Sequence, residues 1–251
     1  MSSEAHRLPV VEVGYKGKGS FAPLSGIEDM TAYIVGPNDA KQVVVIIYDP
    51  FGFSSQILQG ADIISSNLNA KVIIPDILRG QAQDYSRYAA QTEEEKTAIH
   101  AWFRAFGDPN AHVPTVLGVA RAIKSTNPNA RVGVLGLDWG GKIAIKSGTD
   151  GTPYDAVASV HPAFIDDADA RDLTVPIGFF PVKDHRLEQV EKVRDIIAQK
   201  PFADKNTYHL YDTIRHGFAG ARGDLGNSES KKQYEHVYNA VSDFFKRALE
   251  V

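Results

Sequence analysis

The chain has 251 residues, of which 43% are hydrophobic, and a formal net charge of −4 at pH 7, values that suit one folded domain with a large core. The acidic balance argues against nucleic acid as a partner, because phosphate binding needs a basic face. No apolar run reaches the roughly 20 residues that span a bilayer, the N-terminus lacks the apolar stretch of a signal peptide, and the absence of cysteine excludes disulfides, thiolate metal ligands and a thiol nucleophile.

Short β-branched runs alternate with amphipathic segments along the chain, and no repeat or linker interrupts them. In chain order, the expected elements are an antiparallel edge strand at 30–35, a strand at 43–48, a helix at 54–68, a strand at 70–76, helices at 93–106 and 114–125, a strand at 132–137, a helix from 141, strands at 156–160 and 175–180, a helix at 187–198, a strand at 207–211 and a helix at 229–249. This alternation predicts an α/β fold with a mostly parallel central sheet and helices on both faces, in a single domain over residues 1–251.

The strand at 132–137 leads into a tight turn with the sequence Gly136-Leu137-Asp138-Trp139-Gly140. This is the spacing of a nucleophile elbow, Gly-x-nucleophile-x-Gly, which is usually built around Ser. The small residues allow the strand to turn sharply into the next helix. A carboxylate at the centre changes the chemistry, because Asp attacks saturated carbon well and acyl carbon poorly. The acyl product of Asp would be a high-energy anhydride, whereas its alkyl product is an ordinary ester.

Parallel sheets place their sites beyond the carboxyl ends of the strands, so the residues that follow each strand are candidates. Asp138, Asp184 and His216 each lie shortly after a predicted strand. They come in the chain order nucleophile, acid and base that is typical of α/β-hydrolase triads. His161 also ends a strand, where it can either act in the site or only pack against the elbow.

Several segments resemble the motifs of the dienelactone hydrolase family over most of residues 25–250. Besides the elbow, they are Asp49-Pro50-Phe51-Gly52, Pro75-Asp76-Ile77-Leu78, Lys183-Asp184-His185 and the stretch from His216-Gly217-Phe218-Ala219 to Arg222-Gly223-Asp224. The resemblance implies an α/β-hydrolase fold without a large cap domain. It also implies hydrolysis of lactones or esters by a Cys-His-Asp triad.

The family's site residues can be carried over position by position. Asp138 falls on the family's Cys, Asp184 on its acid and His216 on its base. Asp49 falls on a Glu that contacts the resting thiol. The backbone amides of Phe51 and Trp139 fall on those that can form an oxyanion hole, and Arg222 falls on an arginine that can bind a substrate carboxylate. Arg79 is a candidate to assist Arg222.

Asp in place of Cys leaves several functions open. The stretch Asp138-Trp139-Gly140-Gly141 also resembles the elbow of epoxide hydrolases and haloalkane dehalogenases, which form an alkyl-Asp ester and hydrolyse it with a His-activated water. The leading hypothesis is therefore a hydrolase that opens an epoxide-like C–O bond or a C–X bond through Asp138, with Tyr85 and Tyr88 as candidate proton donors. The Trp139 side chain is expected to form the pocket wall or, alternatively, to bind a leaving halide.

Three alternatives remain beside the leading hypothesis. The first is a cyclase or isomerase that uses Asp138 as general acid or base. The second is a lactone or ester hydrolase relative with a substituted or engineered nucleophile, and the third is a binding protein with a degenerate triad. In every case we expect a cytoplasmic monomer or homodimer that acts on a small-molecule substrate, with no nucleic acid, membrane, cofactor or metal.

Overall fold

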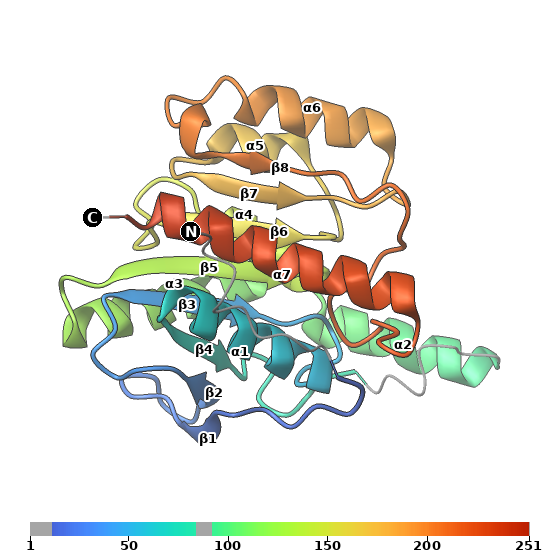
Figure 1. The fold of residues 1–251 in the computed structure, drawn as a ribbon. Helices are drawn as coiled ribbons and strands as arrows, with labels where there is room; N and C mark the ends of the chain where they lie inside the picture. The colour runs from blue at the N-terminus through green and yellow to red at the C-terminus, as the bar shows by residue number, and fades with distance from the viewer. Residues whose placement is uncertain (1–11, 84–91, 251) are drawn as a thin grey trace.

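The computed structural model describes residues 12–83 and 92–250, and strands within these ranges form one eight-stranded sheet (Figure 1). The strands are β1 (Ser20–Pro23), β2 (Thr31–Val35), β3 (Gln42–Ile47), β4 (Lys71–Pro75), β5 (Arg131–Leu137), β6 (Ala156–Val160), β7 (Ile177–Phe180) and β8 (Thr207–Tyr208). Their order in the sheet is β1-β2-β4-β3-β5-β6-β7-β8. Pairing is antiparallel between β1 and β2 and between β2 and β4, and parallel at every other position. The expected α/β fold with a mostly parallel sheet is confirmed.

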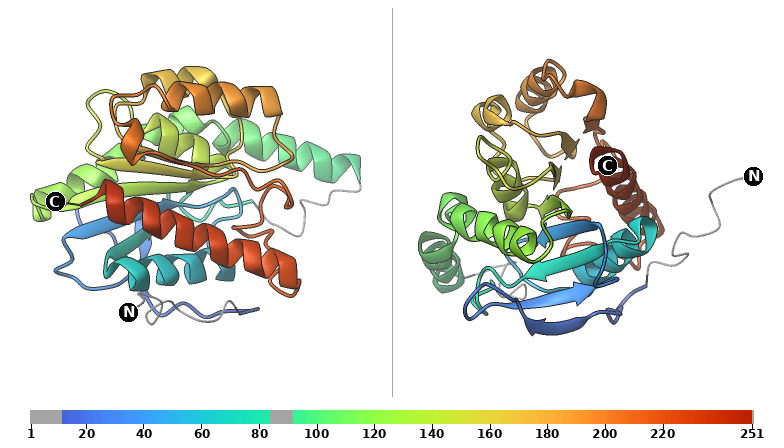
Figure 2. Two further views of the ribbon diagram at one scale, coloured as in Figure 1. Left: turned by 45° about the horizontal axis from the view of Figure 1, so that its top comes forward. Right: turned by 90° about the vertical axis from the view of Figure 1, so that its left-hand side faces the viewer.

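Helices cover both faces of this sheet. They are α1 (Ser55–Leu68), α2 (Glu93–Phe106), α3 (Pro109–Thr126), α4 (Trp139–Lys146), α5 (Asp167–Asp172), α6 (Leu187–Ile197) and α7 (Ser228–Ala248), with a short 3₁₀ turn η3 (Ala203–Lys205). α1 and α7 pack against each other on one face, and α3 and α4 pack together on the other (Figure 2). α2 projects from the body of the molecule, and none of its described residues is buried. The described residues contain no large cap domain over the sheet.

The central strands are buried along almost their whole length. Val43 to Ile47 in β3 are at most 3% exposed, and all of β6 and β7 is buried. Strands of this kind are covered by helices on both faces, which explains their continuous Val and Ile runs. The rigid centre of the sheet therefore positions the loops at the carboxyl ends of β3, β5, β6 and β7.

A few element boundaries differ from those expected from the sequence. α3 begins at Pro109 rather than at 114, because Pro is well tolerated at the first helical position and Asp108 caps the helix by accepting a hydrogen bond from the Asn110 N–H. The last strand is reduced to Thr207–Tyr208, followed by an isolated bridge between Val182 and Tyr211. The short elements β1, α5 and η3 carry too few periodic positions to be recognised in the sequence.

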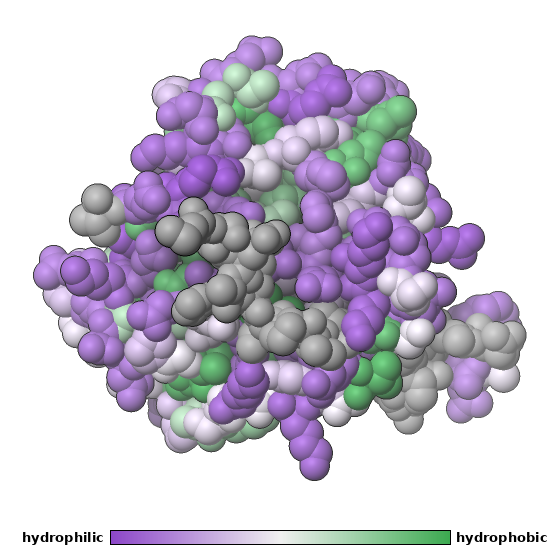
Figure 3. Space-filling view, viewed as in Figure 1, coloured by the Kyte–Doolittle hydropathy of each residue, from purple (hydrophilic) through white to green (hydrophobic). Residues whose placement is uncertain are grey.

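No helix in the described part of the chain is both long enough and apolar enough to cross a membrane. Hydrophilic side chains dominate the face of the molecule on which α7 lies, and hydrophobic side chains occur there in small separate groups (Figure 3).

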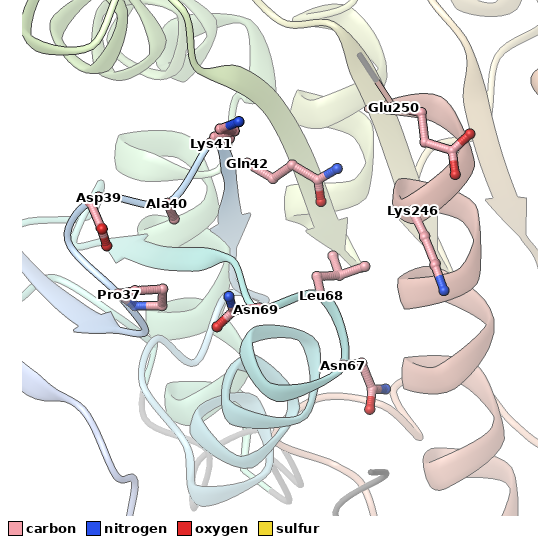
Figure 4. Close-up of a pocket in the computed structure, with 10 residues that line it drawn as sticks. All are labelled: Pro37, Asp39, Ala40, Lys41, Gln42, Asn67, Leu68, Asn69, Lys246 and Glu250. Carbon is pink, nitrogen blue, oxygen red and sulfur yellow. The ribbon is translucent and has the colours of Figure 1, made fainter. Parts of the chain in front are cut away.

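A cavity of about 510 Å³ lies beside the amino-terminal end of β3 (Figure 4). Gln42 at the start of β3 lines it, together with Asp39 and Lys41 from the preceding loop and Lys246 and Glu250 near the end of α7. Its charges are mixed, and none of the predicted catalytic residues lies in it. The predicted catalytic residues Asp138 and His216 line a different cavity.

Candidate active site

Asp138 occupies a strained turn between β5 and α4. Its backbone adopts φ 56° and ψ −117°, a region that side-chain-bearing residues rarely populate. A Cβ at Gly136 would overlap the backbone of Gly140, and a Cβ at Gly140 would overlap carbonyl oxygens at the end of β3. The Asp138 carbonyl accepts hydrogen bonds from the N–H groups of Gly141 (3.0 Å) and Ala163 (2.8 Å). The surrounding backbone thus holds the strained apex in place, as the elbow spacing predicts.

The Asp138 carboxylate is nearly buried and paired with a cation. Only 7% of the residue is exposed. Its Oδ2 accepts a hydrogen bond from Nη2 of Arg222 at 2.7 Å and lies 3.5 Å from Nδ1 of His216. Burial raises the pKa of this carboxyl, while Arg222 and the backbone N–H of Trp139 oppose the rise. A desolvated carboxylate with a raised pKa is a stronger base than an exposed one.

His216 is held as a neutral imidazole. Nη2 of Arg222 lies 2.6 Å from its Nδ1, and because guanidinium can only donate, Nδ1 is the acceptor and the ring proton is on Nε2. Burial, followed by the charge of Arg222, lowers the pKa of His216 to about 4. The ring nitrogen that faces Asp138 therefore carries a lone pair and can accept a proton.

Asp184 contacts His216 through the backbone rather than through the ring. Its Oδ2 accepts a hydrogen bond from the His216 N–H at 3.1 Å. In a Ser-type triad the acid holds the ring N–H of the base, so this arrangement orders the loop rather than the imidazole. The side chains of Asp138 and His216 thus lie next to each other, whereas Asp184 contacts only the backbone of His216 in this hydrogen bond.

Asp49 lies at the end of β3 and is 1% exposed. Its carboxylate accepts hydrogen bonds from the N–H groups of Phe51 (3.0 Å) and Ala221 (2.7 Å). Burial raises the pKa of Asp49 to about 7; the Ala221 N–H opposes this, and the nearby Asp138 carboxylate adds to it. Asp49 therefore titrates near neutral pH. Of the two amides expected to form an oxyanion hole, that of Phe51 donates to the Asp49 carboxylate in this structure, and that of Trp139 lowers the pKa of the Asp138 carboxyl.

The structure supports the expected wall role of the Trp139 side chain over the halide-ligand alternative, and it does not match the role expected of Arg79. The indole N–H of Trp139 donates to the carbonyl of Gly107 at 2.9 Å and the side chain is fully buried, so it is a wall residue and not a halide ligand. Nη1 of Arg79 donates to the carbonyls of Glu28 (3.2 Å) and Asp29 (2.7 Å). Arg79 therefore braces a loop and is not among the residues that line the cavity at Asp138. The candidate proton donors Tyr85 and Tyr88 lie outside the described residues.

A cavity of about 340 Å³ opens onto Asp138, which is a suitable size for a small organic ligand. Polar groups and aromatic rings share its lining: Pro50, Phe51, Phe103, Asp138, Trp139, Ala163, Phe164, His216 and Arg222. Phe103 comes from α2, and Phe164 stands 60% exposed in the loop after β6. Neither ring is identified as a site residue by sequence spacing, because they are brought to the site only by the packing of α2 and by the course of that loop.

His161 lies beneath the site. It is fully buried, and its ring centroid is 5.1 Å from that of His216. Burial lowers its pKa well below the usual value, so the ring is neutral. Neither of its ring nitrogens has a hydrogen-bond partner among the described residues. Its position after β6 marked it as a candidate in the sequence.

Comparisons with known proteins point to one family. The family model described as "Dienelactone hydrolase family" matches residues 30–249. An uncharacterized AIM2 family protein of Schizosaccharomyces pombe is 29% identical over 94% of this chain and 92% of its own length. A carboxymethylenebutenolidase homolog of Rattus norvegicus is 26% identical over 80% of this chain and 79% of its own. Among solved structures, a dienelactone hydrolase of Anabaena variabilis superposes with a TM-score of 0.65 at 14% identity, covering 94% of this chain and 99% of that one.

Proposed function

The chain belongs to the dienelactone hydrolase family, and we propose that it is a hydrolase that cleaves a small, largely apolar ester or lactone with Asp138 as general base. The observation that carries the proposal is the position of the Asp138 carboxylate. It lies at the apex of the elbow, lines the cavity, and is 3.5 Å from the neutral Nδ1 of His216. The family and the relatives named for butenolide hydrolysis support an acyl substrate.

The proposed reaction uses water rather than Asp138 as the nucleophile. Asp138 takes a proton from a water molecule as the water oxygen attacks the acyl carbon. Asp138 and His216 share this proton. The guanidinium of Arg222, which already binds both side chains, stabilises the negative charge that develops on the carbonyl oxygen. The intermediate then expels the alcohol or enol oxygen, which takes the proton back from the Asp138–His216 pair. This route avoids an acyl-Asp anhydride.

The walls of the cavity support a flat, apolar substrate body. Phe51, Phe103 and Phe164 contribute aromatic surface to its lining. A cavity of about 340 Å³ limits the substrate to a small molecule. An ester or lactone group would then lie against Asp138 and Arg222, with its apolar part against the rings.

A second candidate is the alkyl-Asp route at an epoxide-like C–O bond or a C–X bond. It is favoured by the elbow itself, in which the backbone N–H of Trp139 lowers the pKa of the Asp138 carboxyl and so favours its charged form. Against it, Arg222 occupies one carboxylate oxygen and thereby weakens it as a nucleophile. The Trp139 indole N–H is also committed to Gly107 and offers no halide ligand. A cyclase or isomerase would use the same acid–base pair without water.

A substrate panel tests the proposal. Wild-type protein, Asp138→Asn and the control Asp150→Asn, which changes an exposed aspartate in the turn after α4, are assayed on small aromatic esters, enol lactones, epoxides and haloalkanes. We expect hydrolysis of esters or lactones that falls by roughly 10²- to 10⁴-fold in Asp138→Asn and is unchanged in Asp150→Asn. Turnover of epoxides or haloalkanes alone would favour the alkyl-Asp route, and full activity of Asp138→Asn would refute both.

A further inference from the structure

Asp138, His161 and His216 form a three-residue cluster at the elbow. One carboxylate oxygen and one ring nitrogen from each histidine all lie within 4.8 Å of one another. We propose that this cluster binds a divalent transition-metal ion such as Zn²⁺, which takes the place of the Arg222 guanidinium. The metal-bound form would be an alternative state of the site and goes beyond the proposed hydrolysis.

His161 supplies the first argument. It is fully buried, and both of its ring nitrogens lack a hydrogen-bond partner among the described residues. Leaving buried polar atoms without a partner is costly, so such groups usually serve a ligand, an ion or a bound water. The neutral ring has a lone pair on one nitrogen, which is the form that coordinates metals. Its ligand atom lies in the same small volume as those of Asp138 and His216.

Arg222 supplies the second argument, because it already places positive charge in the cluster. Its Nη2 lies 2.7 Å from Oδ2 of Asp138 and 2.6 Å from Nδ1 of His216. Asp138 Oδ2 and His216 Nδ1 thus share the Arg222 guanidinium as donor, whereas the ring nitrogens of His161 accept no hydrogen bond from Arg222. A metal ion at this position would bind all three groups at once. The buried carboxyl of Asp49 also lies close enough to interact electrostatically with Asp138.

The donor set fits the chemistry of a zinc-type site. Two imidazoles and one carboxylate, with an open position for water, are the ligands of many catalytic zinc centres. With metal–ligand bonds of about 2.0 to 2.1 Å, tetrahedral ligands lie about 3.3 Å apart. The 3.5 Å between Asp138 and His216 is already close to this value. The separations that involve His161 are at most 4.8 Å and have to shorten by up to about 1.5 Å when the metal binds. The expectation from the sequence was no metal, and this grouping of Asp138 with two histidines was not predicted.

A titration without any substrate tests the proposal. Tag-free protein is treated with a chelator, dialysed, and titrated with Zn²⁺ by calorimetry and with Co²⁺ by visible absorption. We expect one ion per chain and ligand-field bands for Co²⁺. His161→Phe should weaken binding by more than about a hundredfold, because loss of a direct ligand exceeds the 10- to 100-fold effect of an outer-shell change. Arg222→Gln should tighten binding about tenfold or more, because it removes the competing charge.

His185→Asn is the matched control. His185 packs against His216 at 5.4 Å between ring centroids but lies outside the cluster, and Asn can keep the hydrogen bond that its Nδ1 accepts from Val182. This variant should bind Zn²⁺ like the wild type. The absence of stoichiometric binding, equal affinity in a folded His161→Phe, or weaker binding in Arg222→Gln would each overturn the proposal. Hydrolysis assayed in the presence of a chelator tests the proposed function separately.

Discussion

Replacement of Arg222 by Gln should shift the pH dependence of hydrolysis. Arg222 lowers the pKa of the Asp138 carboxyl against the effect of burial. A charge-assisted hydrogen bond contributes about 1.5 to 3 kcal/mol, and one pKa unit corresponds to about 1.4 kcal/mol, which together give about one to two units. Because the Arg222 side chain is 19% exposed, solvent screening favours the lower end of this range.

The acid limb of the pH profile should move to higher pH because Asp138 acts as a base. Activity is lost at low pH as the carboxylate takes up a proton, so a raised pKa moves this loss to higher pH. We therefore expect the acid limb of kcat/KM to rise by about one pH unit in Arg222→Gln. Asp138 and Asp49 interact, so the limb reports an apparent pKa of the pair.

The assay is kcat/KM measured from about pH 4 to 9 in the presence of a chelator. Arg79→Gln is the matched control, because the Arg79 guanidinium donates to the carbonyls of Glu28 and Asp29 and does not line the cavity. An acid limb that stays in place in Arg222→Gln, or that moves equally in Arg79→Gln, would refute the reasoning.

Three further variants probe the site. Asp49→Asn should gain stability relative to wild type as the pH rises from about 4 to 7, by at most about 4 kcal/mol. In that pH window the buried wild-type carboxyl, with a pKa of about 7, binds more protons in the folded state than in the unfolded state. Urea unfolding at several pH values measures the difference in stability between the two proteins, and a difference that is independent of pH would contradict the expectation. Phe103→Ala should raise KM about tenfold with little change in kcat, since it removes an aromatic wall of the cavity, whereas Arg104→Ala on the exposed side of the same helix should leave KM unchanged. Asp138→Cys should gain hydrolysis of p-nitrophenyl acetate, because a thiolate attacks acyl carbon directly; no gain in a folded variant would indicate that the Phe51 amide stays committed to Asp49.

The backbone of the site could be predicted from the sequence. The buried runs of β3 and β5 and the Gly-x-Asp-x-Gly spacing depend on local periodicity and on small residues, and both signals are strong in short windows. The elbow at Asp138 is formed as this spacing predicts. Parallel pairing then brings the residues after β3, β5 and β6 to one edge.

The side-chain contacts could not be predicted in the same way. Three contacts depend on rotamers and on loops that sequence spacing does not define. They are the hydrogen bonds from the His216 N–H to Asp184, from the Trp139 indole to Gly107 and from Arg79 to Asp29. The two unpartnered nitrogens of His161 become apparent only once burial is known. A resemblance to a family indicates which residues occupy the site, whereas the hydrogen-bond partners of their side chains become known only from the structure.

The most direct test of the central claim is the first turnover in heavy-oxygen water. Enzyme in molar excess is mixed with an ester or lactone that it hydrolyses, and the product and the peptide that contains Asp138 are analysed by mass spectrometry. If Asp138 acts as general base, the product acid carries one heavy oxygen and Asp138 carries none. An unlabelled first product together with heavy oxygen in Asp138 would contradict the claim and establish a covalent route.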